Sequence, residues 1–190
     1  MKTVTVVGVG ALGSHFVLLA RNLAKLRVID FDRVEAKNTL SQFHAKTQIG
    51  KSKVEAMKQT MAFLYGTKLD TNSNKLVEAN AEALLAKSDL VVDCLDNGAS
   101  RKVLQDYVRR AGIECVHAGV APDGTFGRVI WDQSFQIDYE GTQGAATCEA
   151  GEHLPFLATV GAYLARSVQE FLTKGKRTGF SISSTNVVAV

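Results

Sequence analysis

The N-terminal segment holds a glycine-rich turn of the kind that binds nucleotide phosphates. The β-rich run Thr3–Val7 leads into the turn, and apolar residues at helical spacing follow it. In such a turn Gly8 permits the tight bend, Gly10 lets phosphate approach the backbone, and Gly13 lets the helix pack against the sheet. The free amides at the helix N-terminus attract an anion. The pattern therefore predicts a nucleotide site.

An acidic residue follows the second predicted strand. Asp30 comes after Leu26–Ile29, about 20 residues beyond the turn, where a carboxylate typically accepts the ribose hydroxyls of a nucleotide. On this evidence an NAD-dependent oxidoreductase fits as well as an ATP-dependent enzyme. Gly50-Lys51-Ser52 resembles the end of a P-loop, but Ala45 stands where that loop needs its first glycine, and no strand precedes it. We therefore exclude a P-loop.

Further polar motifs separate ATP from NAD. In chain order they are Asp30-Phe31-Asp32-Arg33-Val34, Asn38, Gln42, Gly50-Lys51-Ser52-Lys53, Asp93-Cys94-Leu95-Asp96-Asn97 and Arg101. Each motif alone is weak, but their combination and order are specific. With the glycine turn they resemble the ThiF/MoeB family, which is related to the ubiquitin-activating enzymes. The resemblance covers nearly the whole chain, about residues 4 to 175.

The resemblance implies that the chain binds ATP and Mg²⁺ and adenylates a carboxylate. In the family this is usually the C-terminal glycine of a ubiquitin-like or sulfur-carrier protein, which is the partner we expect. Asn38, Gln42 and Lys53 would face the phosphates, Asp30 would hold the ribose, and Asp96 would hold the metal. The full set of implied nucleotide-binding residues is Gly8, Gly10, Gly13, Asp30, Asp32, Asn38, Gln42, Lys53 and Asn97.

Physical chemistry agrees with these roles. Attack of a carboxylate on the α-phosphorus brings two anions together, so a cation and a metal ion must offset their charge and that of the leaving pyrophosphate. Lys53 and Asp96 supply these functions. Asp96 also follows an apolar strand, and open α/β sheets bind their ligands at the carboxyl ends of such strands.

The sequence departs from the family pattern in its cations. Ser41 stands where the family usually has an arginine, just before Gln42. The N-terminal helix whose arginine reaches the partner subunit's site is not seen before the first strand. These departures motivate an alternative, a non-catalytic or half-active subunit that pairs with an active homologue. The CxxC pairs that bind zinc in many relatives are also missing, so we expect no zinc.

The three cysteines differ in their surroundings. Cys94 and Cys115 lie in apolar runs and are expected to be inert core residues within strands. Cys148 lies in a polar segment just ahead of a predicted helix, where the family often places a cysteine that attacks the adenylate. We therefore treat Cys148 as a candidate nucleophile, with a small loop residue as the alternative. Residues 133–150 would form a loop that holds the substrate tail.

Two other functions remain open at this stage. An NAD-dependent oxidoreductase is supported only by the glycine turn and Asp30. Some relatives of the family adenylate a small carboxylate on a modified tRNA base, and the net charge of +3 neither requires nor excludes this. The basic clusters are short, so we expect no nucleic-acid or membrane partner. From the family we expect a homodimer or a heterodimer with a homologue.

The elements that position these residues alternate between strands and helices. Strands are predicted at Thr3–Val7, Leu26–Ile29, Leu69–Leu76, Asp89–Leu95, Ile113–Gly119, Gly124–Asp132 and Phe180–Val190, and helices at Leu12–Leu26, Lys51–Tyr65, Ala79–Lys87, Ala99–Ala111 and Pro155–Leu172. This order predicts a Rossmann-like, mostly parallel sheet with helices on both faces and a C-terminal antiparallel extension.

Composition fits that architecture. With 190 residues, 46% of them apolar and 22% charged, the chain suits a single domain spanning residues 1–190. An odd number of cysteines without CxxC pairs argues against a disulfide framework and indicates a reducing, cytoplasmic setting. No apolar run is long enough to span a bilayer.

Overall fold

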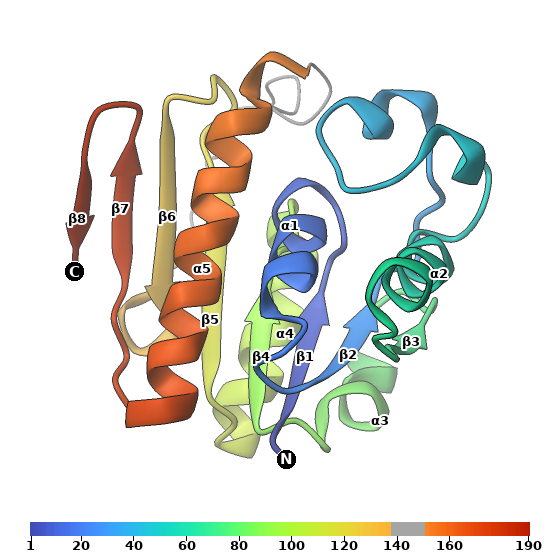
Figure 1. Ribbon diagram of the computed structural model, residues 1–190. Helices are drawn as coiled ribbons and strands as arrows, with labels where there is room; N and C mark the ends of the chain where they lie inside the picture. The colour runs from blue at the N-terminus through green and yellow to red at the C-terminus, as the bar shows by residue number, and fades with distance from the viewer. Residues whose placement is uncertain (138–150) are drawn as a thin grey trace.

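The computed structural model describes residues 1–137 and 151–190, and its strands form an eight-stranded sheet. The sheet order is β3-β2-β1-β4-β5-β6-β7-β8 (Figure 1). Strands β3, β2, β1, β4 and β5 run parallel to their neighbours, whereas β6, β7 and β8 are antiparallel. The predicted α/β class with a C-terminal antiparallel extension is confirmed.

The element bounds lie close to those predicted from periodicity. The strands are β1 Thr3–Val7, β2 Lys25–Ile29, β3 Asp70–Asn72, β4 Leu90–Asp93, β5 Cys115–Val120, β6 Phe126–Trp131, β7 Phe180–Ser183 and β8 Val187–Ala189. The α-helices are α1 Ala11–Ala20, α2 Lys53–Tyr65, α3 Ala81–Leu85, α4 Gly98–Ala111 and α5 Leu154–Lys174. Short 3₁₀ turns occupy Ala36–Leu40, Lys46–Gln48, Glu78–Asn80, Asp132–Ser134 and Gly151–His153.

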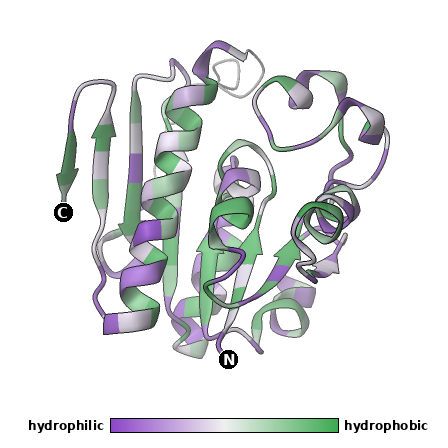
Figure 2. Cartoon of the chain, in the orientation of Figure 1, coloured by the Kyte–Doolittle hydropathy of each residue, from purple (hydrophilic) through white to green (hydrophobic). Residues whose placement is uncertain are grey.

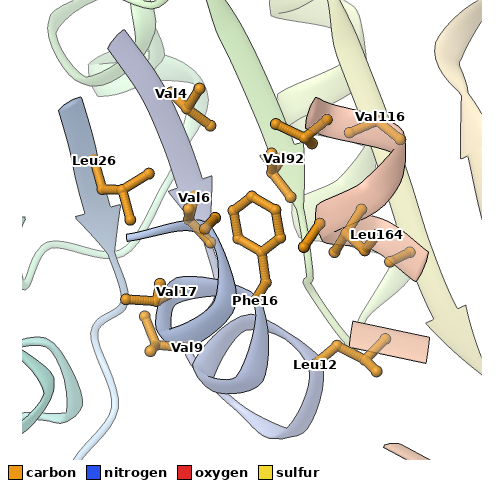
Figure 3. Packing of buried hydrophobic residues seen from close by; sticks show 14 of the residues in the cluster. Val4, Val6, Val9, Leu12, Phe16, Val17, Leu26, Val92, Val116 and Leu164 are labelled. Carbon is orange, nitrogen blue, oxygen red and sulfur yellow. The ribbon is translucent and has the colours of Figure 1, made fainter. Parts of the chain in front are cut away.

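Helices cover both faces of the parallel half of the sheet. Helices α1, α2 and α5 share one hydrophobic cluster with the sheet, and α3 and α4 share a second cluster on the other face. Phe16 of α1 is fully buried against the sheet, beside Val6 and Val92 (Figure 3). The central strands β1, β4 and β5 consist mostly of hydrophobic residues (Figure 2), because a parallel strand is covered on both sides. In the described part of the chain no helix is long and apolar enough to cross a membrane.

The predicted strand Leu69–Leu76 is only Asp70–Asn72, and the predicted strand Phe180–Val190 is two strands, β7 and β8. Two further boundaries were wrong for a local reason. Helix α1 ends at Ala20 rather than at Leu26, because Leu23 closes a turn onto Ala20 and the next apolar residues belong to β2. Strand β4 ends at Asp93, whose carboxylate accepts the Leu95 amide at 2.9 Å and turns the chain away from the sheet. Cys94 was expected inside this strand, but it lies beyond the strand and is half-buried.

Candidate nucleotide site

The glycine turn between β1 and α1 is packed too tightly for other residues at two of its positions. Gly8 has a φ of 91°, and a Cβ there would lie 2.7 Å from the carbonyl oxygen of Cys94. A Cβ on Gly13 would lie 1.9 Å from the carbonyl oxygen of Gly8. At Gly10 a Cβ would meet, among the residues that the structure describes, only Gln42 Nε2, at 3.9 Å. The turn is therefore tightly packed at Gly8 and Gly13, whereas at Gly10 it is open and a ligand can approach the backbone.

Asp30 holds this turn in place from the end of β2. Its Oδ2 accepts the Val9 amide at 2.6 Å and its Oδ1 accepts the Asp32 amide at 2.8 Å. Burial raises the pKa of Asp30, while Lys53 and the two amides oppose that rise. A carboxylate has about four acceptor positions. Asp30 can therefore brace the turn and still accept a hydroxyl from a ligand in the cavity that it lines.

Lys53 is buried at the first position of α2. Only 6% of its surface is exposed, and its Nζ lies 3.1 Å from Asp32 Oδ2. Its own amide donates to the Asp32 carbonyl at 2.9 Å, which ties the start of the helix to the end of β2. A buried ammonium is costly without partners. Lys53 is therefore a fixed cation of the site and not an ordinary lysine on a helix surface.

These groups meet in a cavity of about 390 Å³ at the carboxyl ends of the parallel strands. The cavity brings together most of the residues that the sequence singled out, namely Gly8, Gly10, Asp30, Asp32, Gln42, Lys53, Asp96 and Asn97. Phe31, Lys75 and Leu76 line it as well, and the Lys75 Nζ lies 5.3 Å from the centre of the Phe31 ring. Sequence reasoning assigned no role to these three residues, because no spacing rule connects the segment after β3 with the end of β2.

Gln42 and Asn38 differ in their relation to the cavity. Gln42 is buried in the wall, and its Oε1 has no hydrogen-bond partner within residues 1–137 and 151–190. An unpaired buried acceptor is costly, so a donor from a ligand would be favourable there. Asn38 does not line the cavity; it is buried, and its Oδ1 accepts the Glu35 amide at 2.9 Å. That contact caps the 3₁₀ turn Ala36–Leu40.

Asp96 and Asn97 follow β4 at the mouth of the cavity. Asn97 Oδ1 accepts the Ser100 amide at 2.9 Å and so caps α4, while Asp96 is exposed. The described residues contain no group of three carboxylate, histidine or cysteine side chains that could hold a metal alone. Mg²⁺ is often bound by one or two carboxylates together with substrate phosphates. Asp96 fits a magnesium ion that is bound jointly with a nucleotide.

A comparison with protein families identifies this arrangement. The model described as the ThiF family matches residues 1–183. The chain belongs to the ThiF family. The resemblance inferred from the motifs is thereby confirmed.

Curated relatives of this ThiF-family chain are activating enzymes. Ubiquitin-like modifier-activating enzyme 5 of Drosophila mojavensis is 30% identical over 143 residues, which is 67% of this chain and 36% of the relative. Adenylyltransferase and sulfurtransferase UBA4 of Lodderomyces elongisporus is 33% identical over 135 residues, which is 68% of this chain and 30% of the relative. The SAMP-activating enzyme E1 of Haloferax volcanii is 31% identical over 148 residues, which is 69% of this chain and 54% of the relative. The aligned segments thus span between about a third and about half of these relatives.

Solved structures share the fold over the whole chain. E. coli MccB in complex with AMPCPP and MccA has a TM-score of 0.79 at 15% identity, covering 100% of this chain and 63% of that chain. The E. coli tRNA N6-threonylcarbamoyladenosine dehydratase TcdA has a TM-score of 0.73 at 18% identity, covering 92% of this chain and 87% of that chain. At these identities the likeness concerns the fold.

Two buried histidines to which sequence reasoning gave no role contact backbone carbonyls, and His44 thereby supports the glycine turn. His44 Nε2 lies 3.0 Å from the Val9 carbonyl, and burial lowers the pKa of His44 to about 4. His15 Nε2 lies 3.0 Å from the Ser41 carbonyl, and burial lowers the pKa of His15 too. Neutral rings at these positions do not replace the arginine charge that the family usually has at position 41. No sequence signal marked either ring, because the partners are backbone carbonyls of other segments.

Both described cysteines lie where the thiolate form is disfavoured. Burial raises the pKa of the Cys115 thiol, and burial and Asp93 raise that of Cys94. Cys94 nevertheless lines the cavity, which its assignment to the strand did not foresee. Cys148, the candidate nucleophile, lies outside the described residues.

Proposed function

We propose that this ThiF-family chain uses ATP to adenylate a carboxylate. The observation that carries the proposal is the cavity itself, because one space of about 390 Å³ is lined by the glycine turn, the buried Lys53 and the exposed Asp96. A glycine turn and an acidic ribose site suit any dinucleotide. A fixed cation together with a carboxylate at the mouth of the cavity suits a triphosphate and its metal.

Each residue contributes one function to the proposed reaction. Backbone amides near Gly10 and the N-terminus of α1 would receive phosphate, and Asp30 would accept ribose hydroxyls. Lys53 would offset the negative charge as a carboxylate oxygen attacks the α-phosphorus and the bond to the leaving pyrophosphate breaks. Asp96 would hold Mg²⁺, which supplies further charge neutralisation at the phosphates. The product would be an acyl-adenylate.

The carboxylate that we propose is the C-terminal glycine of a ubiquitin-like or sulfur-carrier protein. The names of the relatives support this choice, because they include activators of ubiquitin-like modifiers and of SAMP. A second hollow of about 500 Å³ between β5, β6 and Phe135 shares Arg101 and the segment Ala118–Val120 with the nucleotide cavity. It would admit the acyl end of a substrate next to the phosphates. The Cys148 thiolate would then attack the acyl carbon of the adenylate, forming a thioester as the bond to phosphate breaks and AMP leaves.

The missing arginine supports a second candidate, a half-active subunit. Ser41 carries no charge, and His15 and His44 are neutral. None of the three therefore adds a cation to that of Lys53, the buried lysine of the described cavity. A homologous partner could then complete the site within a heterodimer, whereas a homodimer would have to work with these residues. Activity of this chain that appears only after addition of such a homologue would favour the second candidate over the first.

The test is ATP–pyrophosphate exchange with a candidate carrier protein that ends in Gly-Gly. Asp96→Ala is expected to abolish exchange, because the carboxylate that would hold the metal is lost. Asp106→Ala is the matched control, since Asp106 is an exposed acid on α4 that pairs with Lys102 at 2.8 Å, away from the cavity. Normal exchange by Asp96→Ala would refute its role. Calorimetric titration showing tight NADH binding without ATP binding would refute adenylation itself.

A further inference from the structure

A histidine lies between two carboxylates in the wall of the second hollow, which adjoins the nucleotide cavity. His117 is on β5, and its side chain is fully buried. Its Nδ1 lies 2.7 Å from Oδ2 of Asp93, the last residue of β4, and its Nε2 lies 3.1 Å from Oδ1 of Asp132. Asp132 begins the 3₁₀ turn Asp132–Ser134 that follows β6. One ring therefore bridges three segments that are separated in the sequence.

The other partners of both carboxylates are hydrogen-bond donors. Asp93 accepts the Leu95 amide at 2.9 Å, and its Oδ2 lies 3.4 Å from an Arg101 Nη1. Asp132 accepts from Gln105 Nε2 and from Arg109 Nε, each at 2.8 Å. Burial alone would raise the pKa of Asp132, but the hydrogen bonds from Arg109, Gln105 and His117 hold it below its usual value. Both carboxylates are thus placed to accept and not to donate.

This geometry limits the protonation state of the ring between them. A neutral imidazole has one N–H donor and one acceptor nitrogen, whereas an imidazolium has two donors. A neutral His117 would set a lone pair against a carboxylate oxygen on one side, in a place where water cannot intervene. We propose that His117 is held as an imidazolium that donates to both Asp93 and Asp132, and that this bridge positions the loop carrying Asp96.

The bridge connects the nucleotide side with the segment after β6. On one side, Asp93 fixes the Leu95 amide and so the course of the chain toward Asp96. On the other side, the Phe135 ring stacks on the His117 ring, with centroids 3.9 Å apart. Further along, the Ile137 Cγ2 lies 3.8 Å from the place of a Cβ on Gly98, the first residue of α4. Residues 132–137 therefore run along α4, from Gln105 and Arg109 beside Asp132 to Gly98 beside Ile137.

Charges around the ring come from each element packed against it. The acids are Asp93 and Asp132, the bases are Arg101 and Arg109, and the thiols of Cys94 and Cys115 lie in the same environment. Arg101 also donates to the carbonyls of Leu95 and Ala118, at 2.9 Å and 2.6 Å respectively, and so links the β4 loop to β5. Two acids, two guanidinium groups and an imidazolium make a closed set of donors and acceptors.

The protonation state can be tested by NMR on protein labelled with ¹⁵N-histidine, since the chain has only four histidines. The His117 signals, assigned from their loss in His117→Gln, are expected to show both ring nitrogens protonated at neutral pH. In Asp132→Asn the negative charge beside Nε2 is lost, so His117 is expected to become neutral with its proton on Nδ1. Asp106→Asn is the control and should leave the ring doubly protonated. A neutral His117 in the wild-type protein would overturn the proposal, whatever reaction the chain catalyses.

The positioning role has its own readout in the backbone amides of residues 95–98. His117→Phe keeps the stacking on Phe135 but cannot bridge, so these amide resonances are expected to shift, whereas in Asp132→Asn they should stay near their wild-type positions. Unchanged resonances in His117→Phe would overturn the positioning role. If that variant does not fold, His117→Gln serves in its place, and the same resonances are expected to shift; unchanged resonances in it would overturn the positioning role equally.

The role of the bridge toward Asp96 rests on the proposed function. A measurement of nucleotide binding links the two. Loss of a group that orients a metal ligand typically weakens metal binding by about 10- to 100-fold. His117→Phe is expected to weaken Mg-ATP binding by about tenfold on this basis, with adenosine affinity unchanged. An equal loss for both ligands would indicate general damage and contradict the positioning role. Failure of the wild-type chain to bind Mg-ATP would instead refute the proposed function, and the histidine and amide spectra would still decide the bridge.

Discussion

Replacing Lys53 with methionine isolates the charge that we assign to the phosphates. The side chain is 6% exposed and its Nζ lies 3.1 Å from Asp32 Oδ2. Methionine keeps much of the apolar stem, and the carboxylate left behind is 48% exposed, so water can solvate it. We therefore expect the free energy of unfolding to fall by less than about 1 kcal/mol, the usual contribution of a partly exposed ion pair.

The effect on nucleotide binding should be much larger. A hydrogen bond to a charged group contributes about 1.5–3 kcal/mol, which corresponds to about 10- to 100-fold in affinity. Calorimetric titration of Lys53→Met with Mg-ATP should show a loss in that range, whereas adenosine, which lacks phosphates, should bind as it does to wild type. Unfolding in urea provides the parallel measurement of stability.

Lys51→Met is the matched control for this experiment. Lys51 is exposed, lies near the start of the same helix and donates to Gln59 Oε1 at 3.1 Å. Its removal lowers the net charge equally but should not change ATP affinity at moderate salt, because exposed charges are screened. Equal losses in the two variants would show that only net charge matters. Wild-type ATP affinity in Lys53→Met would refute the placement of the phosphates beside this lysine.

Two further predictions concern the glycine turn and its histidine support. Gly13→Ala should lower the free energy of unfolding by about 3 kcal/mol or prevent folding, because its Cβ would lie 1.9 Å from the Gly8 carbonyl oxygen. Gly10→Ala should instead fold normally and lose ATP affinity. Equal stability of the two variants in urea would contradict the packing described. Burial lowers the pKa of His44 from 6.5 to about 4, so the unfolded chain takes up the proton first and stability falls as the pH drops from about 6.5 to about 4, by about 3 kcal/mol. Urea titrations across that range should show a shallower pH dependence in His44→Gln, and an unchanged slope would count against a neutral buried His44.

Prediction from sequence succeeded where the information is local. The strand, the glycine turn and the start of the helix in residues 3–20 follow from neighbouring residues. It failed at the end of α1, where Leu23 and Leu26 continue the helical periodicity although they belong to a turn and to β2. Apolar periodicity shows that a residue is buried, and it does not show which element buries it.

The sequence by itself determined the family, the class of fold and eight of the residues that line the cavity, because their order along the chain is characteristic and the parallel strands bring their carboxyl ends to one edge. Only the tertiary structure decided that Asn38 caps a turn, that Lys53 is buried, and that His44 supports the glycine turn. It also decided that His117 lies between Asp93 and Asp132. The physical reason is that burial and hydrogen bonding join segments distant in the chain, and no spacing rule records such contacts.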